Sequence, residues 1–213
     1  MPVIGICNQK GGSGKSSTAV HLARWLQSQS DSILVVDSDG QRTSSLWLNA
    51  LSSPIPYEII PEPDRLLERL PDLAGRYQWT IVDAPGTLAE ASRAIVLWSD
   101  FVLIPCQPTG VDLASTSDTI RLIGQARAIR KGEPRAAIFL NRAIKGTRLK
   151  QEAFSVLKAI PNIDVLSEVI HQRQIIADAF GQSATVFDLA GDAAQDAQKE
   201  YGRLFNSMVG LLG

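Results

Sequence analysis

Short apolar runs alternate along the chain with longer segments in which apolar residues recur every three to four positions. Continuous apolar runs bounded by polar segments are typical of strands that are buried on both faces of a sheet. These runs lie at Val3–Cys7, Ile33–Val36, Trp79–Val82, Phe101–Pro105, Ala136–Leu140 and Ile163–Ile170. The main segments with helical spacing are Lys15–Gln27, Asp112–Arg130, Arg148–Ile160 and Asp192–Leu212. The pattern predicts an α/β fold of three layers, with a mostly parallel central sheet flanked by helices.

One segment departs from this alternation. Leu51–Pro71 is the part of the chain richest in proline, and we predict a loop there with a short helix at its end. No repeat, linker or low-complexity stretch interrupts the pattern, so residues 1–213 are predicted to form a single domain.

Composition narrows the class of protein. The formal net charge of −1 provides no global basic field, so any contact with nucleic acid must come from a local patch. Cys7 and Cys106 lie within apolar runs and are too few for a zinc or iron–sulfur centre. No apolar run approaches the roughly 20 residues of a membrane-spanning helix, and no signal peptide is visible. We therefore expect a cytoplasmic protein.

A glycine-rich loop follows the first predicted strand and opens the first predicted helix. Glycines allow such a loop to curl so that backbone N–H groups and the helix N-terminus face an anion. Lys15 is predicted to reach the β- and γ-phosphates of ATP, and the Ser16 hydroxyl to bind Mg²⁺. The predicted nucleotide-binding residues of this loop are Lys10, Gly11, Gly12, Ser13, Gly14, Lys15, Ser16 and Ser17.

Acidic residues follow two further strands, at the sheet edge where the loop also lies. Asp83 is predicted to hold Mg²⁺ or its water ligands, and Asp37 to lie near the metal. Gly86 would let a backbone N–H approach the γ-phosphate. A single aspartate after a strand often only opens a turn or caps a helix, but three that converge on one phosphate loop, with Asp39 as the third, favour a metal and nucleotide site.

The loop differs from the usual G-x-x-x-x-G-K-[ST] pattern, because Gln9 replaces the first glycine and Lys10 adds a second lysine. This K-G-G-x-G-K-[ST] sequence resembles the deviant Walker A motif of the ParA/MinD family of ATPases. The resemblance implies a homodimer that encloses two ATP molecules, in which Lys10 contacts the nucleotide of the partner subunit. It also implies that Asp39 positions the attacking water, so Lys10, Lys15 and Asp39 are the predicted catalytic residues. Gly40 stands where the family usually has proline, which loosens this segment.

Two further segments resemble the family. Asn141 and Arg142 lie where the family contacts the adenine base, although asparagine after a strand is often only a turn former. Pro105–Asp112 resembles a P-x-x-P-x-x-x-D stretch that flanks the family's dimer interface. The same stretch also reads as a strand-to-helix turn with Asp112 as the helix N-cap.

The predicted DNA contacts are basic residues late in the chain. The segment from His171 to Gln174 resembles one that carries a DNA-contacting arginine in the family, which here is Arg173; it also reads as a solvated surface charge. Other family members have basic residues where this chain has Leu189–Asp192. Two clusters are candidate substitutes, although both read equally as solvated helix faces: Lys145, Arg148 and Lys150, and Arg127, Arg130, Lys131 and Arg135.

The resemblance is nearest to small ParF-like plasmid partition proteins and implies a partition or positioning ATPase. Its ATP-bound dimer would bind nonspecific DNA, associate with the nucleoid, and move a plasmid or chromosome through a ParB/ParG-like adaptor that stimulates hydrolysis. We expect no N-terminal helix-turn-helix, because the phosphate loop begins about ten residues from the start.

Three alternatives stay open. The same mechanism could position a protein cargo such as a microcompartment. A MinD-like membrane ATPase needs a basic amphipathic C-terminal helix, whereas Tyr201–Gly213 contains one basic residue, so no membrane partner is expected. An ATP-dependent amidating or carboxylating enzyme would need a second substrate site, of which the sequence shows no sign.

Overall fold

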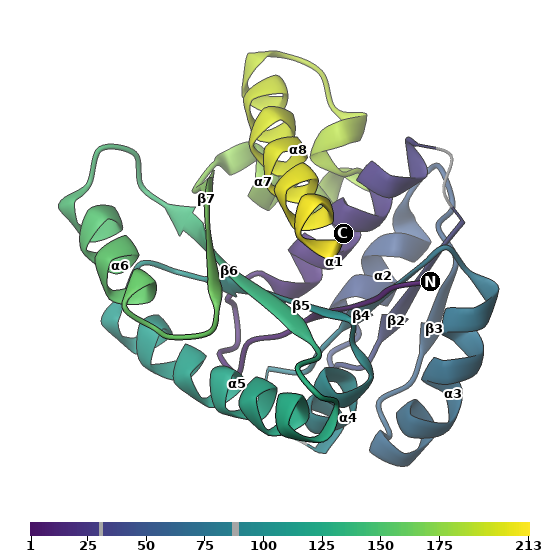
Figure 1. Ribbon diagram of the computed structural model, residues 1–213. Coiled ribbons are helices and arrows are strands. Elements are labelled where there is room, and N and C mark those ends of the chain that lie inside the picture. The colour runs from purple at the N-terminus through teal and green to yellow at the C-terminus, as the bar shows by residue number, and fades with distance from the viewer. Residues whose placement is uncertain (30–31, 87–89) are drawn as a thin grey trace.

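A seven-stranded parallel sheet forms the centre of the protein (Figure 1). The computed structural model describes residues 1–29, 32–86 and 90–213. The described strands are β1 (Val3–Ile6), β2 (Ile33–Asp37), β3 (Tyr57–Ile59), β4 (Trp79–Asp83), β5 (Phe101–Cys106), β6 (Arg135–Ala143) and β7 (Asp164–His171). Their order is β3-β2-β4-β1-β5-β6-β7, and every recorded pairing is parallel. The direction of strand addition reverses around β1, which creates a crevice at the carboxyl ends of the strands.

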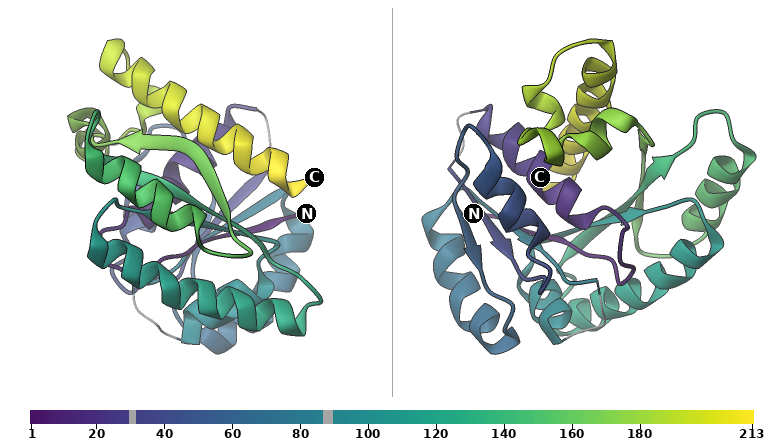
Figure 2. Two further views of the ribbon diagram at one scale, coloured as in Figure 1. Left: turned by 60° about the vertical axis from the view of Figure 1, so that its left-hand side comes forward. Right: turned by 180° about the vertical axis from the view of Figure 1, so that it is seen from behind.

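Helices cover both faces of this sheet (Figures 1 and 2). On one face lie α1 (Lys15–Gln27), α2 (Thr43–Ala50) and α8 (Asp192–Leu212), together with the short helices α7 (Gln174–Asp178), η1 (Phe180–Gln182) and η2 (Val186–Asp188). On the other face lie α3 (Pro63–Arg76), α4 (Glu90–Trp98), α5 (Gly110–Ile129) and α6 (Arg148–Lys158). This arrangement confirms the predicted three-layer α/β fold.

Two apolar cores hold the layers together, one on each side of the sheet. Alternate strand residues point into opposite cores; for example, Ile4 belongs to the first and Val3 to the second. The closing helix α8, predicted from its helical spacing, buries Leu204, Phe205 and Met208 completely. Cys7 and Cys106 are buried free thiols, also as predicted.

The segment from Leu51 to Pro71 differs in part from the predicted loop with a short helix at its end. It contains the edge strand β3, and the 14-residue helix α3 begins within it at Pro63. Proline is favourable at the first helical position, where its missing N–H has no helical partner. Leu66, Leu70 and Leu73 repeat at helical spacing and are buried, which provides the packing that maintains the helix past Pro71. The eight-residue α2 and nine-residue α4 were not predicted either.

The start of α5 shows whether Asp112 is the N-cap of this helix. Thr109 is the N-cap, and its side-chain oxygen accepts a hydrogen bond from the backbone N–H of Asp112. Asp112 therefore lies in the first turn of the helix and is not its cap. A carboxylate in the first turn is favourable because of the positive end of the helix dipole.

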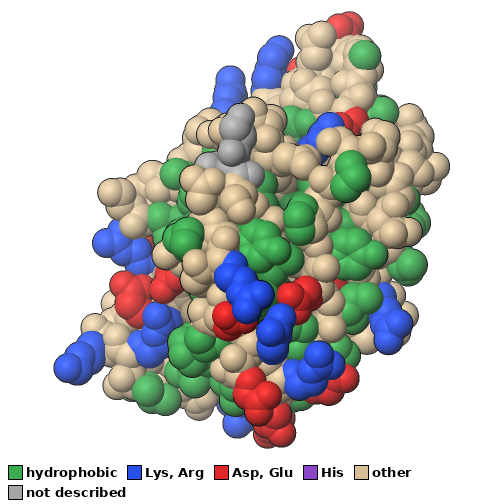
Figure 3. Space-filling model, turned by 90° about the vertical axis from the view of Figure 1, so that its right-hand side faces the viewer, with side chains coloured by type: hydrophobic (Ala, Val, Ile, Leu, Met, Phe, Trp, Pro, Cys, Tyr) green, Lys and Arg blue, Asp and Glu red, His purple; other side chains and the backbone are tan. Residues whose placement is uncertain are grey.

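The face of the molecule over α3 mixes charges of both signs (Figure 3). Arg69 on α3 pairs with Glu58 of β3 and with Asp72, and Arg76 pairs with Asp72 as well. Positive charge is therefore not concentrated on this face.

Candidate nucleotide-binding site

The glycine-rich loop connects the central strand β1 to helix α1 at the sheet crevice. Gly12 and Gly14 adopt left-handed conformations, with φ angles of 78° and 100°, which favour glycine. Helix α1 begins directly after Gly14, with no acidic residue in its first turn. Loop N–H groups and the positive helix N-terminus thus meet at one place, as anion binding requires.

Both predicted lysines lie at this loop, in different surroundings. Lys15 is almost fully buried, and its Nζ donates a hydrogen bond of 3.2 Å to the carbonyl oxygen of Lys10. Burial lowers the pKa of Lys15, and the nearby carboxylates of Asp83 and Asp39 oppose this effect. The Lys10 side chain instead forms an ion pair with Asp112 on α5, with 2.6 Å between its Nζ and a carboxylate oxygen.

Two other predicted residues, Asp39 and Gly86, lie close to Lys15. Asp39 lines the cavity above the loop together with Lys15 and Gly86. A side chain at Gly86 would place its Cβ 3.3 Å from the Cα of Gly11, so glycine permits this close approach of the β4–α4 segment to the loop. The backbone of Gly86 therefore lies against the loop, while the approach of its N–H to the γ-phosphate stays a prediction.

The two aspartates of the predicted metal site each end a buried strand, but they differ in their hydrogen bonds. Asp37 and Asp83 are paired in register at the ends of β2 and β4, and both are fully buried. Both carboxylate oxygens of Asp37 accept backbone hydrogen bonds, from Asp39 at 3.1 Å and Ser45 at 2.8 Å. Asp37 thus shapes the segment that carries Asp39.

Asp83 is the carboxylate that fits a metal ion. Neither of its oxygens has a hydrogen-bond partner among the described residues. Burial raises its pKa to about 7; the charge of Asp37 raises it further, and the hydroxyl groups of Ser16 and Ser44 lower it. A buried carboxylate without partners is costly unless a cation compensates it. Asp83, with the adjacent Ser16 hydroxyl, therefore provides the oxygen ligands that Mg²⁺ prefers.

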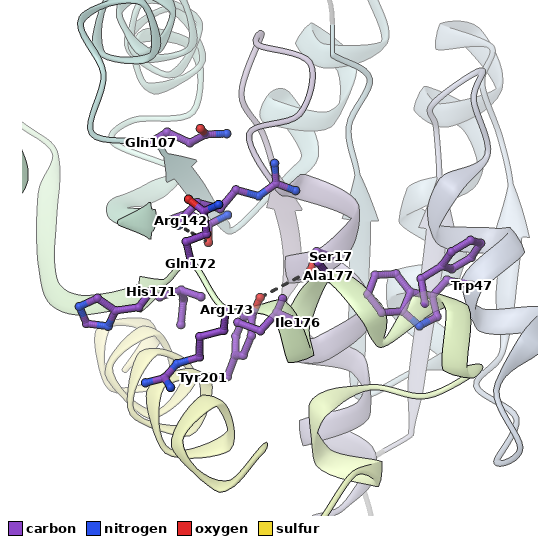
Figure 4. Close-up of a pocket in the computed structure, with 13 residues that line it drawn as sticks. Ser17, Trp47, Gln107, Arg142, His171, Gln172, Arg173, Ile176, Ala177 and Tyr201 are labelled. Carbon is purple, nitrogen blue, oxygen red and sulfur yellow. Dashed lines mark hydrogen bonds between the residues drawn. The ribbon is translucent and has the colours of Figure 1, made fainter. Parts of the chain in front are cut away.

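Two adjoining cavities extend from the loop. The first, of about 320 Å³, is lined by the loop, Asp39 and Gly86. The second, of about 400 Å³, lies between β6, β7 and α8 (Figure 4). Ser17, Trp47 and Arg142 line both cavities, so the two lie next to each other. The phosphate end and a larger, partly aromatic end thus form one groove of suitable extent for a nucleotide.

Asn141 and Arg142 both lie along this groove. Arg142 is exposed and adopts a left-handed φ of 53°. Asn141 is buried, and its amide nitrogen donates a 2.8 Å hydrogen bond to the carbonyl oxygen of Ser13. The structure therefore places both residues at the groove, while their contact with adenine stays a prediction.

The predicted DNA-contacting residues form one surface region, with one exception. Lys145 and Arg173 line one hollow beside His171, and Lys145 and Lys150 line the next. Arg148 is exposed on α6 but lines neither hollow. In the alternative cluster, Arg127 and Arg130 donate hydrogen bonds to backbone carbonyl groups of their own chain.

Arg173 is not a free surface charge. Its guanidinium pairs with Glu200 at 2.7 Å and with Asp196 at 3.1 Å, both from α8. The hydrogen bond to Glu200 is the main cause that raises the pKa of Arg173. No sequence pattern indicates this pairing, because the partners lie more than 20 positions away along the chain.

Some residues at the site were not predicted from the sequence. Trp47 and Tyr201 line it, and the Tyr201 hydroxyl lies 3.5 Å from the Ser17 hydroxyl. Ser44 is fully buried beside Asp83, with an unpaired hydroxyl. Helical spacing could have marked Tyr201 as a core position, but α2, which carries Trp47 and Ser44, was itself not predicted.

The family model for the CobQ/CobB/MinD/ParA nucleotide binding domain matches residues 4–186. The chain belongs to this family. The match confirms the resemblance to ParA/MinD proteins, and it covers the loop and the groove residues other than Tyr201. The chain is accordingly a P-loop ATPase that uses ATP and Mg²⁺. The role of Asp83 as a metal ligand stays a prediction.

Relatives with curated names cover different shares of the chain. The carboxysome distribution protein McdA of Gloeobacter kilaueensis is 27% identical over 95% of this chain and 91% of its own. ParA of Rhizobium radiobacter is 28% identical over 59% of this chain and 57% of its own.

Solved structures of the family share the fold. An ATP complex of McdA from Cyanothece has a TM-score of 0.79 at 18% identity, and covers 99% of this chain and 96% of that one. MinD from Pyrococcus furiosus has a TM-score of 0.75 at 19% identity, with 99% of both chains covered. At these identities the likeness shows the fold alone.

Proposed function

We propose that this ATPase positions a cargo through an ATP-driven dimer that binds nonspecific DNA and is released by a cargo-bound adaptor. The main support is the near-complete match to McdA proteins, which covers 95% and 97% of the chain. The matches to ParA and Soj cover 59% each. A protein body such as a microcompartment is therefore the cargo we favour, although plasmid and chromosome were the first expectation from sequence.

Plasmid or chromosome partition is the second candidate. ParA of Rhizobium radiobacter and the chromosome-partitioning ATPase Soj of Thermus thermophilus are each 28% identical in their matched parts. Partition ATPases and protein-positioning ATPases would share the same nucleotide site. The two candidates differ in the adaptor and its cargo, not in the chemistry of this chain.

The residues of the groove have distinct roles in this proposal. The buried ammonium of Lys15 stabilises negative charge on the phosphates, and Ser16 and Asp83 hold Mg²⁺, which neutralises charge on the phosphate oxygens. Asp39 lies at the mouth of the phosphate cavity, where it orients the attacking water. Lys10 would contact the nucleotide of the partner subunit in the dimer.

The DNA-binding surface in this proposal comprises Lys145, Lys150 and Arg173, with Arg148 at its margin. Binding through phosphate contacts is independent of sequence and strongly dependent on salt. A membrane-associated role has less support. The large apolar residues Tyr201, Leu204, Phe205 and Met208 of α8 are buried in the core, and no described helix is long and apolar enough to cross a membrane.

Fluorescence anisotropy with a random-sequence duplex tests the DNA step. The Asp39→Ala variant keeps ATP bound for longer, so it should bind the duplex with Mg²⁺-ATP but not with Mg²⁺-ADP. The affinity should fall steeply as salt rises. Equal binding in both nucleotides, or binding that salt does not change, would contradict the proposal.

Deletion of the gene in its own host distinguishes the two cargoes. Imaging would follow protein bodies and labelled plasmid or chromosome origins in the same cells. Clustered protein bodies with normally inherited DNA support the protein cargo. Lost or misplaced DNA with normally spaced protein bodies selects partition instead.

A further inference from the structure

Two carbonyl groups of the phosphate loop, those of Gly12 and Ser13, accept hydrogen bonds from amide side chains of neighbouring strands. In a planar trans peptide, the C=O of one residue and the N–H of the next point in opposite directions. A partner that holds the carbonyl of Gly12 therefore also fixes the N–H of Ser13. By the same geometry, a partner of the Ser13 carbonyl fixes the N–H of Gly14.

Asn141, at the end of β6, is one of these partners. Its Nδ2 donates to the Ser13 carbonyl oxygen at 2.8 Å, and its Oδ1 accepts from the backbone N–H of Arg142 at 3.0 Å. Only 3% of the residue is exposed. A Cβ on Gly14 would lie 2.1 Å from the Asn141 nitrogen. Both ends of the amide are thus occupied within the chain, and the loop is packed directly against it.

Gln107, at the end of β5, is the other partner. Its Nε2 donates to the Gly12 carbonyl oxygen at 2.9 Å. The strands β5 and β6 are adjacent and paired along their whole contact, so they present these amides to consecutive peptide groups of the loop. The rigid sheet thereby sets the orientation of the loop.

We propose that Asn141 and Gln107 are positioning residues that orient the Gly14 and Ser13 N–H groups toward the phosphates. Their contribution to binding depends on the phosphates and not on the base. For Asn141 this role replaces the adenine contact expected from the sequence. The inference rests on the assignment of the groove as the nucleotide site.

Isothermal titration calorimetry in Mg²⁺ tests the inference with ATP, GTP, tripolyphosphate and adenosine. The variants Asn141→Leu and Gln107→Met nearly conserve shape and add no charge, but each leaves a loop carbonyl without its donor. Each should weaken ATP, GTP and tripolyphosphate binding by the same factor, about tenfold, and leave adenosine binding unchanged. Gln125→Met is the matched control, since this exposed glutamine on α5 lines neither cavity of the groove.

The outcomes separate the possible failures. If Asn141→Leu weakens ATP and adenosine but not tripolyphosphate, Asn141 contacts the base and the inference is wrong. Unchanged affinity for all ligands would also overturn it. If Asn141→Leu does not fold, the half-exposed Gln107 provides the same test. Wild-type protein that binds neither ATP nor tripolyphosphate would instead refute the nucleotide-site assignment.

Discussion

The ammonium group of Lys10 lies 2.6 Å from a carboxylate oxygen of Asp112 in the same chain. Asp112 is fully buried, whereas a third of the Lys10 side chain is exposed. The lysine that would contact the partner's nucleotide is therefore held by its own chain in this form. For the Lys10 side chain to reach the partner's nucleotide across a dimer interface, this ion pair must break first.

The Asp112→Asn variant should form the ATP dimer more readily. The amide can still bond to Thr109 but no longer holds the lysine by charge, so we expect dimerisation at about five- to tenfold lower protein concentration. Sedimentation velocity across a concentration series measures this. Asp118→Asn, on the exposed side of the same helix, is the control. Weaker dimerisation of Asp112→Asn would show that Asp112 itself acts within the dimer.

Asp83 should make Mg²⁺ binding sensitive to pH. Its pKa of about 7 means that below this pH a proton must leave before the metal binds. The affinity of the nucleotide complex for Mg²⁺ should fall by up to about tenfold per unit below pH 7 and level off above it. Mg²⁺ titrations with a fluorescent ADP analogue measure this, and comparison with Asp83→Asn removes the titration of the nucleotide itself. If the Mg²⁺ affinity depends on pH equally in the wild type and in Asp83→Asn, Asp83 is not the group that titrates.

His21 should make the fold less stable in acid. Its Nδ1 donates to the Ser17 carbonyl at 2.7 Å and its Nε2 accepts from the Val186 N–H at 3.2 Å, which defines a neutral tautomer. The ring also stacks on Tyr201. Burial lowers its pKa from 6.5 to about 4.

The unfolded chain therefore takes up this proton first as the pH falls. The contribution of His21 to stability is complete above pH 6.5, and about 3 kcal/mol is lost between pH 6.5 and 4. Urea unfolding at several pH values measures the loss. His21→Gln should flatten that part of the curve, while His171→Gln, which keeps His21, should not. Equal slopes in wild type and His21→Gln would refute the assignment.

Arg173 should contribute one phosphate contact per chain, once it leaves Glu200 and Asp196. Arg173→Ala should weaken ATP-dependent DNA binding equally for all sequences and reduce the salt dependence by about one ion per chain. DNA titrations at four salt concentrations measure this. Arg121→Ala, an exposed arginine on α5, is the control. If the salt dependence of DNA binding is unchanged in Arg173→Ala, Arg173 serves only to hold the end of β7 against α8 through its ion pairs.

The parts of the site that local sequence determines were predictable. The phosphate loop follows from its glycines, because their left-handed backbone is a local property, and the buried strands follow from continuous apolar runs. The strand β3 and the helices α2 and α4 were missed because three to nine residues provide too little periodicity to identify.

Relations between distant segments could not be predicted. Asp37 and Asp83 both end buried strands, but only the structure shows that backbone N–H groups occupy one carboxylate and leave the other free. The pairing of Arg173 with Glu200 and the hydrogen bond from Asn141 to Ser13 depend on how α8 and β6 pack. These contacts join residues 27 and 128 positions apart, a separation at which no sequence pattern operates.

The central claim is an ATP-dependent dimer that requires Lys10. Analytical ultracentrifugation in Mg²⁺-ATP compares Asp39→Ala, which slows turnover, with the double variant that also carries Lys10→Ala. We predict that the single variant sediments as a dimer and the double variant as a monomer, while both bind ATP. If the single variant binds ATP but stays monomeric, or the double variant dimerises equally well, the proposed cycle is wrong.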